Sequence, residues 1–494
     1  INKMNKTVLA LLFLVSFCSA TQAQVFYGSP DFSEEFQGKA LYYKIIDAGK
    51  HYVAFVNSPT YVGGYADNSY KGLTTFPAEV VHNGINYYVK QIAVRQAPFM
   101  VDDFYIPEGV ESIVTSINWY GDIKRMHLPT TLKNLGYALQ TVMFPCKVIG
   151  LEKTQITAIN AFSCEQSFAL EQHWEFPSTL RRIGDDAIIY SGTLKDKNIT
   201  LPEHLDSIAY KPWTSNGYGT DPKYERVRLL NPRPALMTHQ GNDPTHSYYY
   251  NSKDMKDLFG TNVQVVTVPI DATRAYETNT DWSYFAGKYR EEVKIGTAGY
   301  TTYYLENENF EVPAGCTAYI ITGITPSGKH GVPSTAHAQA FGAGKIIPKQ
   351  TGFILQGTPS STIEYQANVT GTEENVTGNL LVGTATEQEF SSASYKYYIL
   401  SNSGDQGLGF YKQGTRDGAS IKLKPHRAGL RLPAGVAPAK GIIIDFDEAE
   451  PAVTAIDTPA ADMPKKDIIY NLQGQRVARA EHGIYIINGK KVIK

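Results

Sequence analysis

A short unit recurs four times between residues 104 and 208, and it constrains the fold more than any other feature of the chain. Each copy consists of apolar-x-apolar-Pro, two variable residues, and then [Leu/Val]-x-x-[Ile/Leu]. The residues directly before the four prolines are Ile106, Leu128, Phe176 and Leu201. They are separated by 22, 48 and 25 residues, and Ile156-x-x-Ile159 supplies one more copy, without a proline, inside the 48-residue gap. A period in the twenties is typical of a leucine-rich solenoid, in which no single repeat buries its apolar face alone.

The apolar-x-apolar-Pro part of each copy predicts a short strand that ends at the proline, which cannot donate to the ladder. Because side chains alternate along a strand, residues one and three places before the Pro-preceding residue are expected to face outward. One expected column is Tyr105, His127, Leu151, Glu175 and Thr200, and the other is Asp103, Arg125, Ile149, His173 and Asn198. Their mixed charge, imidazole, hydroxyl and aromatic groups predict a recognition face, and the alternative is a solvated sheet face without a partner. A one-residue slip in register would invert the assignment.

The repeats resemble a known family. The clearest copy runs from Trp174 to Ile188, and residues 160–164 match the Ala-Phe and Cys part of the preceding unit. The pattern Leu-x-x-Ile-x-Leu-Pro-x-x-Leu-x-x-Ile-Gly-x-x-Ala-Phe is similar to the BspA-like, or Treponema pallidum-type, leucine-rich repeats of bacterial surface proteins. The third copy departs from it by lacking the proline, and the second and fourth carry extra residues before the strand. The resemblance implies a secreted or cell-surface protein that binds rather than catalyses.

The whole chain is predicted to be mainly β, a leucine-rich repeat solenoid capped at both ends and followed by an antiparallel β-sandwich module. Asn83-Gly84 predicts a two-residue hairpin in the N-terminal cap, and Trp282 and Phe285 are expected to cover the last repeat. The predicted segments are a signal peptide (1–23), an N-terminal β cap (24–84), the repeats (85–230), a C-terminal cap (231–289), a β-sandwich (290–446), a linker (447–466) and a β hairpin (467–494). The last piece resembles the C-terminal sorting tails of Bacteroidetes proteins in a shortened form.

The first 23 residues have the order expected of a cleavable signal peptide: Lys6, an apolar run from Val8 to Phe17, and small residues ending at Ala23. That run is about half of the ~20 residues that a spanning helix needs, so export without a transmembrane anchor is predicted. Beyond it the chain holds Cys146, Cys164 and Cys316. Each is expected to fill a core position, and a disulfide between Cys146 and Cys164 on neighbouring repeats is the alternative.

The sequence carries no recognisable catalytic or cofactor motif. It has no nucleophile elbow, zinc helix or phosphate loop, and its 11 histidines are dispersed. Asp185-Asp186 follows a predicted turn, where aspartate is common for conformational reasons. We therefore predict no enzyme, no cofactor and no metal site. A net charge of −2 without a basic stripe argues against nucleic acid as a partner.

Binding is the predicted function, with an adhesin-like recognition of host, matrix or bacterial surface proteins by the repeat face. A glycan-binding accessory protein that uses the β-sandwich is the alternative, and exposed aromatic side chains on one face of 290–446 would favour it. An enzyme with two unfamiliar carboxylates in a cleft of the sandwich is a third possibility.

Overall fold

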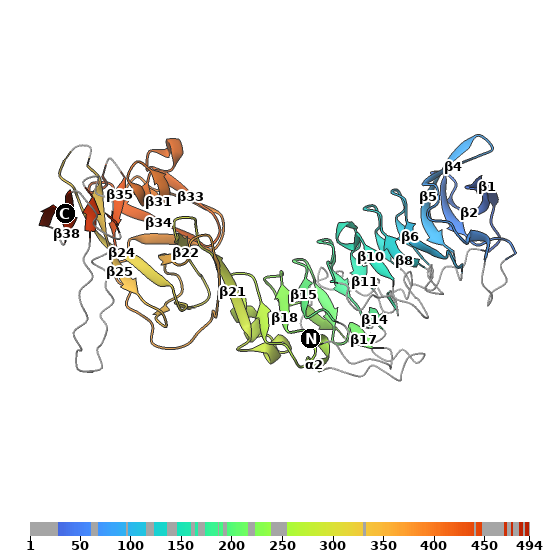
Figure 1. Cartoon of the computed structure of the whole chain (residues 1–494), viewed down its shortest axis with the longest axis horizontal. Helices are drawn as coiled ribbons and strands as arrows, with labels where there is room; N and C mark the ends of the chain where they lie inside the picture. The colour runs from blue at the N-terminus through green and yellow to red at the C-terminus, as the bar shows by residue number, and fades with distance from the viewer. Residues whose placement is uncertain are drawn as a thin grey trace, which may run out of the picture. The chain divides into compact units, whose positions relative to one another are not determined.

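The computed structural model describes residues 28–60, 68–94, 97–114, 123–135, 146–159, 164–165, 173–185, 187–190, 195–215, 223–238, 254–329, 332–438, 441–446, 469–471, 476–477, 484–487 and 490–493. The chain divides into two compact units, residues 1–449 and 450–494. Strands make up 44 % of the structure and helices 6 %, which confirms the predicted mainly-β class (Figure 1). The predicted signal peptide and linker lie outside the described residues.

The first unit contains a long parallel ladder with one strand for each sequence repeat. Its strands in order are β3 (Tyr52–Val56), β5 (Ile85–Ala93), β7 (Ser112–Ile113), β9 (Asn134–Leu135), β11 (Ala158–Ile159), β13 (Arg182–Ile183), β16 (Ser207–Ala209) and β19 (Leu236–Thr238). From β5 to β16, the last apolar residue of the motif pairs with its equivalent in the next repeat. These residues are Ile92, Ile113, Leu135, Ile159, Ile183 and Ile208. All six are fully buried, and each contributes about 1.5–3 kcal/mol of burial free energy only when its neighbours are stacked on it.

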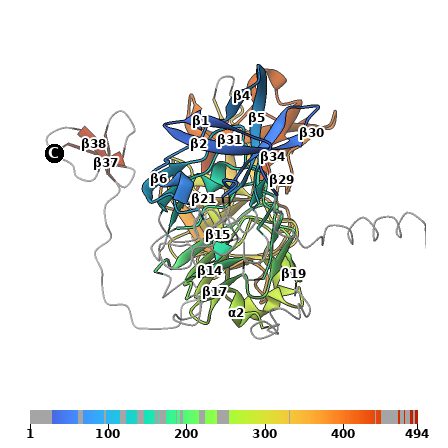
Figure 2. The same cartoon turned by 90° about the vertical axis from the view of Figure 1, so that its right-hand side faces the viewer.

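Two further sets of parallel strands run beside this ladder. The first half of the motif forms β6 (Val101–Tyr105), β8 (Ile123–His127) and β10 (Lys147–Ile149), and later β15 (Asn198–Leu201), β18 (Arg226–Leu229) and β20 (Val265–Thr267). The third set is β12 (Cys164–Glu165), β14 (Ile188–Tyr190) and β17 (Trp213–Ser215). In Figure 2, β6, β17 and β19, one strand from each set, lie on different sides of the stack. The predicted strand at 174–176 is absent, although Trp174 is buried there as expected.

Each proline of the motif begins a tight turn. The carbonyl oxygens of Pro107, Pro129, Pro177 and Pro202 accept hydrogen bonds from the backbone N–H three residues later, at 3.4, 3.2, 3.0 and 3.4 Å. In the copy without proline a 3-10 helix, η2 (Leu151–Lys153), makes the turn instead, and the Gly150 oxygen accepts from Lys153 at 3.1 Å. Gly150 has φ +87, and a Cβ at this position would lie 3.1 Å from the Leu128 oxygen, so glycine is required there.

Both ends of the parallel ladder are covered. At the N-terminal end lie β1 (Phe32–Phe36), β2 (Lys39–Asp47) and β4 (Glu79–His82), and the predicted Asn83-Gly84 hairpin joins β4 to β5. A short 3-10 helix, η1 (Asn68–Tyr70), follows β3. At the other end are α2 (Lys256–Phe259), α3 (Thr273–Glu277) and η3 (Trp282–Phe285). Trp282 and Phe285 are buried and contact the Phe259 ring, as expected of covering residues.

A nine-stranded sheet dominates the rest of the first unit. Its strands in order are β22 (Tyr300–Tyr303), β27 (Phe353–Gln356), β24 (Thr317–Thr325), β25 (Ser334–Phe341), β35 (Ile442–Asp445), β32 (Gly407–Tyr411), β31 (Tyr395–Gly404), β34 (Arg427–Pro433) and β29 (Leu381–Thr384). Only the β25–β35 pair is parallel. The sheet is nearly closed, since the Ala428 N–H on β34 donates to Thr302 Oγ1 on β22 at 3.2 Å.

Two small sheets and one turn accompany it. They are β23 (Phe310–Glu311) with β26 (Ile346–Ile347), β30 (Gln388–Ser391) with β33 (Ser420–Leu423), and the 3-10 helix η4 (Gly414–Arg416). The expected domain boundary at 289/290 falls inside one continuous strand, β21 (Tyr289–Lys294). This strand pairs with β20 on one side and β28 (Thr362–Tyr365) on the other. A backbone sheet therefore joins the parallel strands to the segment that follows them.

The second unit is a four-stranded antiparallel sheet. Its order is β37 (Arg476–Val477), β36 (Ile469–Asn471), β38 (Ile484–Ile487) and β39 (Lys490–Ile493). The predicted C-terminal hairpin corresponds to β38 and β39, which pair antiparallel. Within the described parts of the chain, no helix has the length and apolar character needed to cross a membrane.

Candidate functional site

A polar cluster lies on β6 and β8, where four of the predicted face residues come together. The parallel register places Asp103 beside Arg125 and Tyr105 beside His127. Phe104 and Met126 alternate with them and are fully buried, which anchors both strands. The outward side chains therefore project from strands that Phe104 and Met126 anchor in the core.

Asp103 is the centre of this cluster. Its Oδ1 accepts from Arg125 Nε at 2.6 Å, and its Oδ2 pairs with Arg125 Nη2. His127 Nε2 lies 3.0 Å from the same Oδ1. The His127 ring also stacks on Tyr105 at 4.1 Å between centroids and 15° between planes. Tyr105 remains 49 % exposed, so the cluster presents an aromatic face and a fixed ion pair to solvent.

Asp103 and Arg125 each stabilise the charged form of the other. Hydrogen bonds from Arg125 and then His127 hold the pKa of Asp103 well below its usual range. Asp103 in turn raises the pKa of Arg125. The bidentate ion pair therefore stays charged throughout the neutral and mildly acidic range.

The third repeat departs from the predicted columns by two residues. The register of β10 places Lys147 opposite Arg125 and Ile149 opposite His127. Ile149 thus belongs with Tyr105 and His127, and not with Asp103 as expected. Leu151 lies in η2 and is buried, so its predicted exposure is wrong. The two columns were defined by their distance from the motif proline, and this repeat has no proline to fix the register. Lys147, an exposed cation, was therefore not predicted.

The remaining predicted residues do not join this cluster in one sheet. His173 and Glu175 are exposed but lie outside any strand. Asn198 and Thr200 lie on β15, whose described partner is β18 and not the β6–β8–β10 sheet. His173 Nδ1 instead contacts Asp196 Oδ2 at 2.7 Å, a partner that alternation did not predict. The predicted face residues outside β6, β8 and β10 therefore lie on other elements than the Asp103 cluster.

Several other candidate features have structural roles. Trp174 and Trp213 are buried, so neither offers a face for stacking on a sugar. Asp185 is buried in a turn, and Asp186 lies outside the described residues. Cys146 and Cys316 occupy core positions as predicted, and the Cys164 side chain is not described. No group of three or more potential metal ligands occurs among the described residues.

The comparisons with known proteins leave the function to be argued from these residues. No protein-family model matches the chain, and no curated protein matches its sequence.

Proposed function

We propose that this chain is an exported, non-enzymatic binding protein of the BspA-like leucine-rich repeat type. In this proposal, the parallel strands form a capped solenoid, and the nearly closed nine-stranded sheet is the core of the appended β-sandwich module. The 21–25-residue steps between equivalent buried residues of the long ladder support a solenoid. Export is proposed from the signal-peptide-like segment before Gln24.

The ligand in this proposal is a protein on a host, matrix or bacterial surface, bound by the Asp103 cluster. The observation that carries it is the preformed contact among Asp103, Arg125 and His127 beneath an exposed Tyr105. Tyrosine and arginine are enriched among residues that dominate protein–protein affinity. Because the cluster is already ordered by its own hydrogen bonds, binding would lose little side-chain entropy.

The glycan-binding alternative in its original form loses support. It required exposed aromatic side chains on one face of residues 290–446. In the described part of that segment every Tyr and Phe residue is buried or half-buried, and the segment contains no Trp. A flat stacking platform for a polysaccharide is therefore not favoured.

Arg125→Ala is expected to weaken binding of a protein ligand by about tenfold or more, because it removes one side of an ordered interfacial ion pair. The ligand is found by probing arrays of matrix and bacterial surface proteins with the full chain from Gln24. Affinities are then measured by surface plasmon resonance. Thermal stability should hardly change, since exposed ion pairs contribute about 0–1 kcal/mol.

Lys124→Ala is the matched control. Lys124 precedes Arg125 on the same strand, carries the same charge, and pairs with Asp102 at 2.6 Å. Loss of binding in Arg125→Ala but not in Lys124→Ala supports the proposed surface. Equal affinities for the wild type and Arg125→Ala would exclude it. Point variants are preferable to a truncation near Phe285, because that cut removes β21 from a sheet that it shares with β20.

A further inference from the structure

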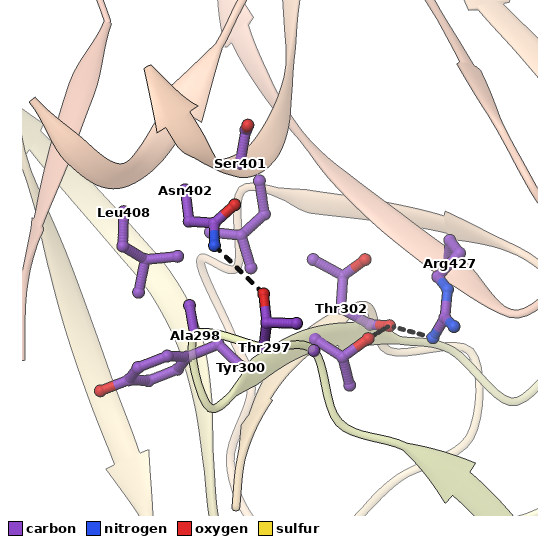
Figure 3. Close-up of a pocket in the computed structure, with 11 residues that line it drawn as sticks. Thr297, Ala298, Tyr300, Thr302, Ser401, Asn402, Leu408 and Arg427 are labelled. Carbon is purple, nitrogen blue, oxygen red and sulfur yellow. Dashed lines mark hydrogen bonds between the residues drawn. The ribbon is translucent and has the colours of Figure 1, made fainter. Parts of the chain in front are cut away.

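A cavity of about 250 Å³ lies at the seam where the nine-stranded sheet nearly closes. Its walls come from the 296–298 turn, β22, β31, Leu408 of β32 and the first residue of β34. Figure 3 shows Thr297, Tyr300 and Thr302 on one side, with Ser401 and Asn402 facing them and Arg427 at one end. The lining is thus rich in hydroxyl and amide groups and contains a single cation.

Arg427 has most of its hydrogen-bonding capacity unused. Its Nη1 donates to the Thr302 carbonyl oxygen at 3.0 Å, and it forms no ion pair with any described residue. A guanidinium group has five N–H donors, so the Nε and Nη2 donors have no partner in the described chain. Burial lowers the pKa of Arg427, which reflects a cation that water solvates poorly.

In another arginine of this chain, Arg125, the Nε and Nη2 donors do have a carboxylate partner. On Arg125, Nε and Nη2 bind the two oxygens of Asp103. This side-on pairing is the preferred geometry between arginine and a carboxylate. In Arg427 the corresponding pair of donors makes no hydrogen bond to a described residue, so both can bind the two oxygens of a carboxylate in the cavity.

The cavity walls are held rigidly by the sheet. The Thr302 carbonyl fixes the Arg427 side chain, while Thr302 Oγ1 accepts from the Ala428 N–H. Asn402 Nδ2 contacts Thr297 Oγ1 at 3.5 Å across the cavity. The Tyr300 ring stacks on Phe446 with 4.8 Å between centroids. Donors and acceptors are therefore positioned before any ligand arrives, which reduces the entropy lost on binding.

We propose that this cavity binds a single acidic sugar residue, with its carboxylate on Arg427 and its hydroxyl groups on the threonine, serine and asparagine side chains. Pockets for drug-sized ligands measure roughly 300–1,000 Å³, so a smaller cavity suits one sugar ring. The polar lining matches a hydroxylated ligand better than an apolar acid. The inference does not depend on the Asp103 cluster.

The test uses the full chain from Gln24 and isothermal titration calorimetry with glucuronate, glucose and inorganic sulfate. Glucuronate is expected to bind, and Arg427→Gln is expected to weaken it by tenfold or more. Arg431→Gln is the control, because Arg431 lies on the same strand and its guanidinium is 4.8 Å from the Tyr395 ring, outside the cavity lining. Arg427→Lys should also bind glucuronate more weakly, because it keeps the positive charge but loses the two parallel N–H donors of the guanidinium group.

Thermal unfolding of each variant shows that it is folded. If Arg427→Gln does not fold, Ser401→Ala and Asn402→Ala are titrated in its place, and each is expected to weaken glucuronate binding. The proposal is overturned if glucuronate does not bind, or if glucose binds as tightly. Sulfate binding without glucuronate binding also overturns it. Arg125→Ala should bind glucuronate normally, which separates this proposal from the protein-binding one.

Discussion

Replacing Glu308 with Gln is expected to stabilise the protein at neutral and alkaline pH. Glu308 is 1 % exposed, and its Oε1 accepts from the Arg274 N–H at 2.5 Å. Its Oε2 has no hydrogen-bond partner of standard geometry, although it lies near enough to Glu291 for the two carboxyl groups to interact. Burial, and then the negative charge of Glu291, raise the pKa of Glu308 to about 10.

The direction of the pH dependence follows from that pKa. In the unfolded chain Glu308 ionises near its ordinary pKa of 4.5, whereas in the folded protein it stays protonated up to about pH 10. The contribution of protonated Glu308 to the free energy of unfolding is therefore complete below pH 4.5 and is lost as the pH rises toward 10. At pH 7 the loss amounts to roughly 3 kcal/mol, from 1.36 kcal/mol for each pH unit. Glutamine cannot ionise, so Glu308→Gln avoids this loss while its amide oxygen still accepts from Arg274.

Calorimetric unfolding at pH 5, 7 and 9 measures the effect. The unfolding temperature of Glu308→Gln should exceed that of the wild type by an amount that grows from pH 5 to pH 9. Glu306→Gln serves as the control, because Glu306 is exposed two residues earlier in the same loop and should change little at any pH. A Glu308→Gln protein less stable than the wild type at pH 9 would contradict the argument.

The regular part of the fold was predictable because its determinants are local and repeated. The proline recurs in four copies and marks the tight turn. The [Leu/Val]-x-x-[Ile/Leu] segment marks the fully buried column from Ile92 to Ile208. Asp103, Tyr105, Arg125 and His127 lie in register on neighbouring strands because two intact copies of the motif align there. In the repeat that contains Leu151 no proline fixes the register, and the predicted outward positions were wrong by two residues.

The cavity and the buried carboxyl groups were not predictable from local pattern. Arg427 meets Thr302 only because the nine-stranded sheet curls until its first and eighth strands meet. Glu291 and Glu308 come together around residues 271–274, and nothing in the nearby sequence distinguishes them from surface glutamates. Pairing between strands far apart in the sequence brings these residues together. This region has no clear sequence repeat from which that pairing could be predicted.

Glu291→Ala is expected to be the most destabilising of the substitutions considered. Glu291 is fully buried on β21, and it accepts from the backbone N–H groups of Asp271, Ala272 and Thr273 at 2.9, 3.2 and 3.2 Å. It also accepts from Thr273 Oγ1 at 2.8 Å and from the Tyr365 hydroxyl at 2.6 Å. Because the Tyr365 proton is used in this bond, the Tyr303 hydroxyl, 2.6 Å away, must donate to Tyr365.

Removing the carboxylate would leave four donors without their acceptor, since the Ala272 N–H also donates to the Pro269 oxygen at 3.2 Å. Each unsatisfied buried polar group costs about 1–3 kcal/mol unless water enters. Partial relaxation brings the expected loss to roughly 3–5 kcal/mol, as for a broken buried ionic network. The loss should fall on the connection between the 271–273 segment and β28, since Glu291 on β21 accepts hydrogen bonds from both.

Glu292→Ala provides the matched control for Glu291→Ala. Glu292 is the next residue on β21, points to the other face, and pairs with Arg228 at 2.6 Å in a partly exposed position, so its removal should cost at most about 1 kcal/mol. Calorimetry should therefore separate the two variants widely, and equal losses would refute the assigned role. The double variant with Glu308→Gln adds a sharper test. Without the charge of Glu291 the pKa of Glu308 falls, so Glu308→Gln should stabilise the Glu291→Ala background less than it stabilises the wild type.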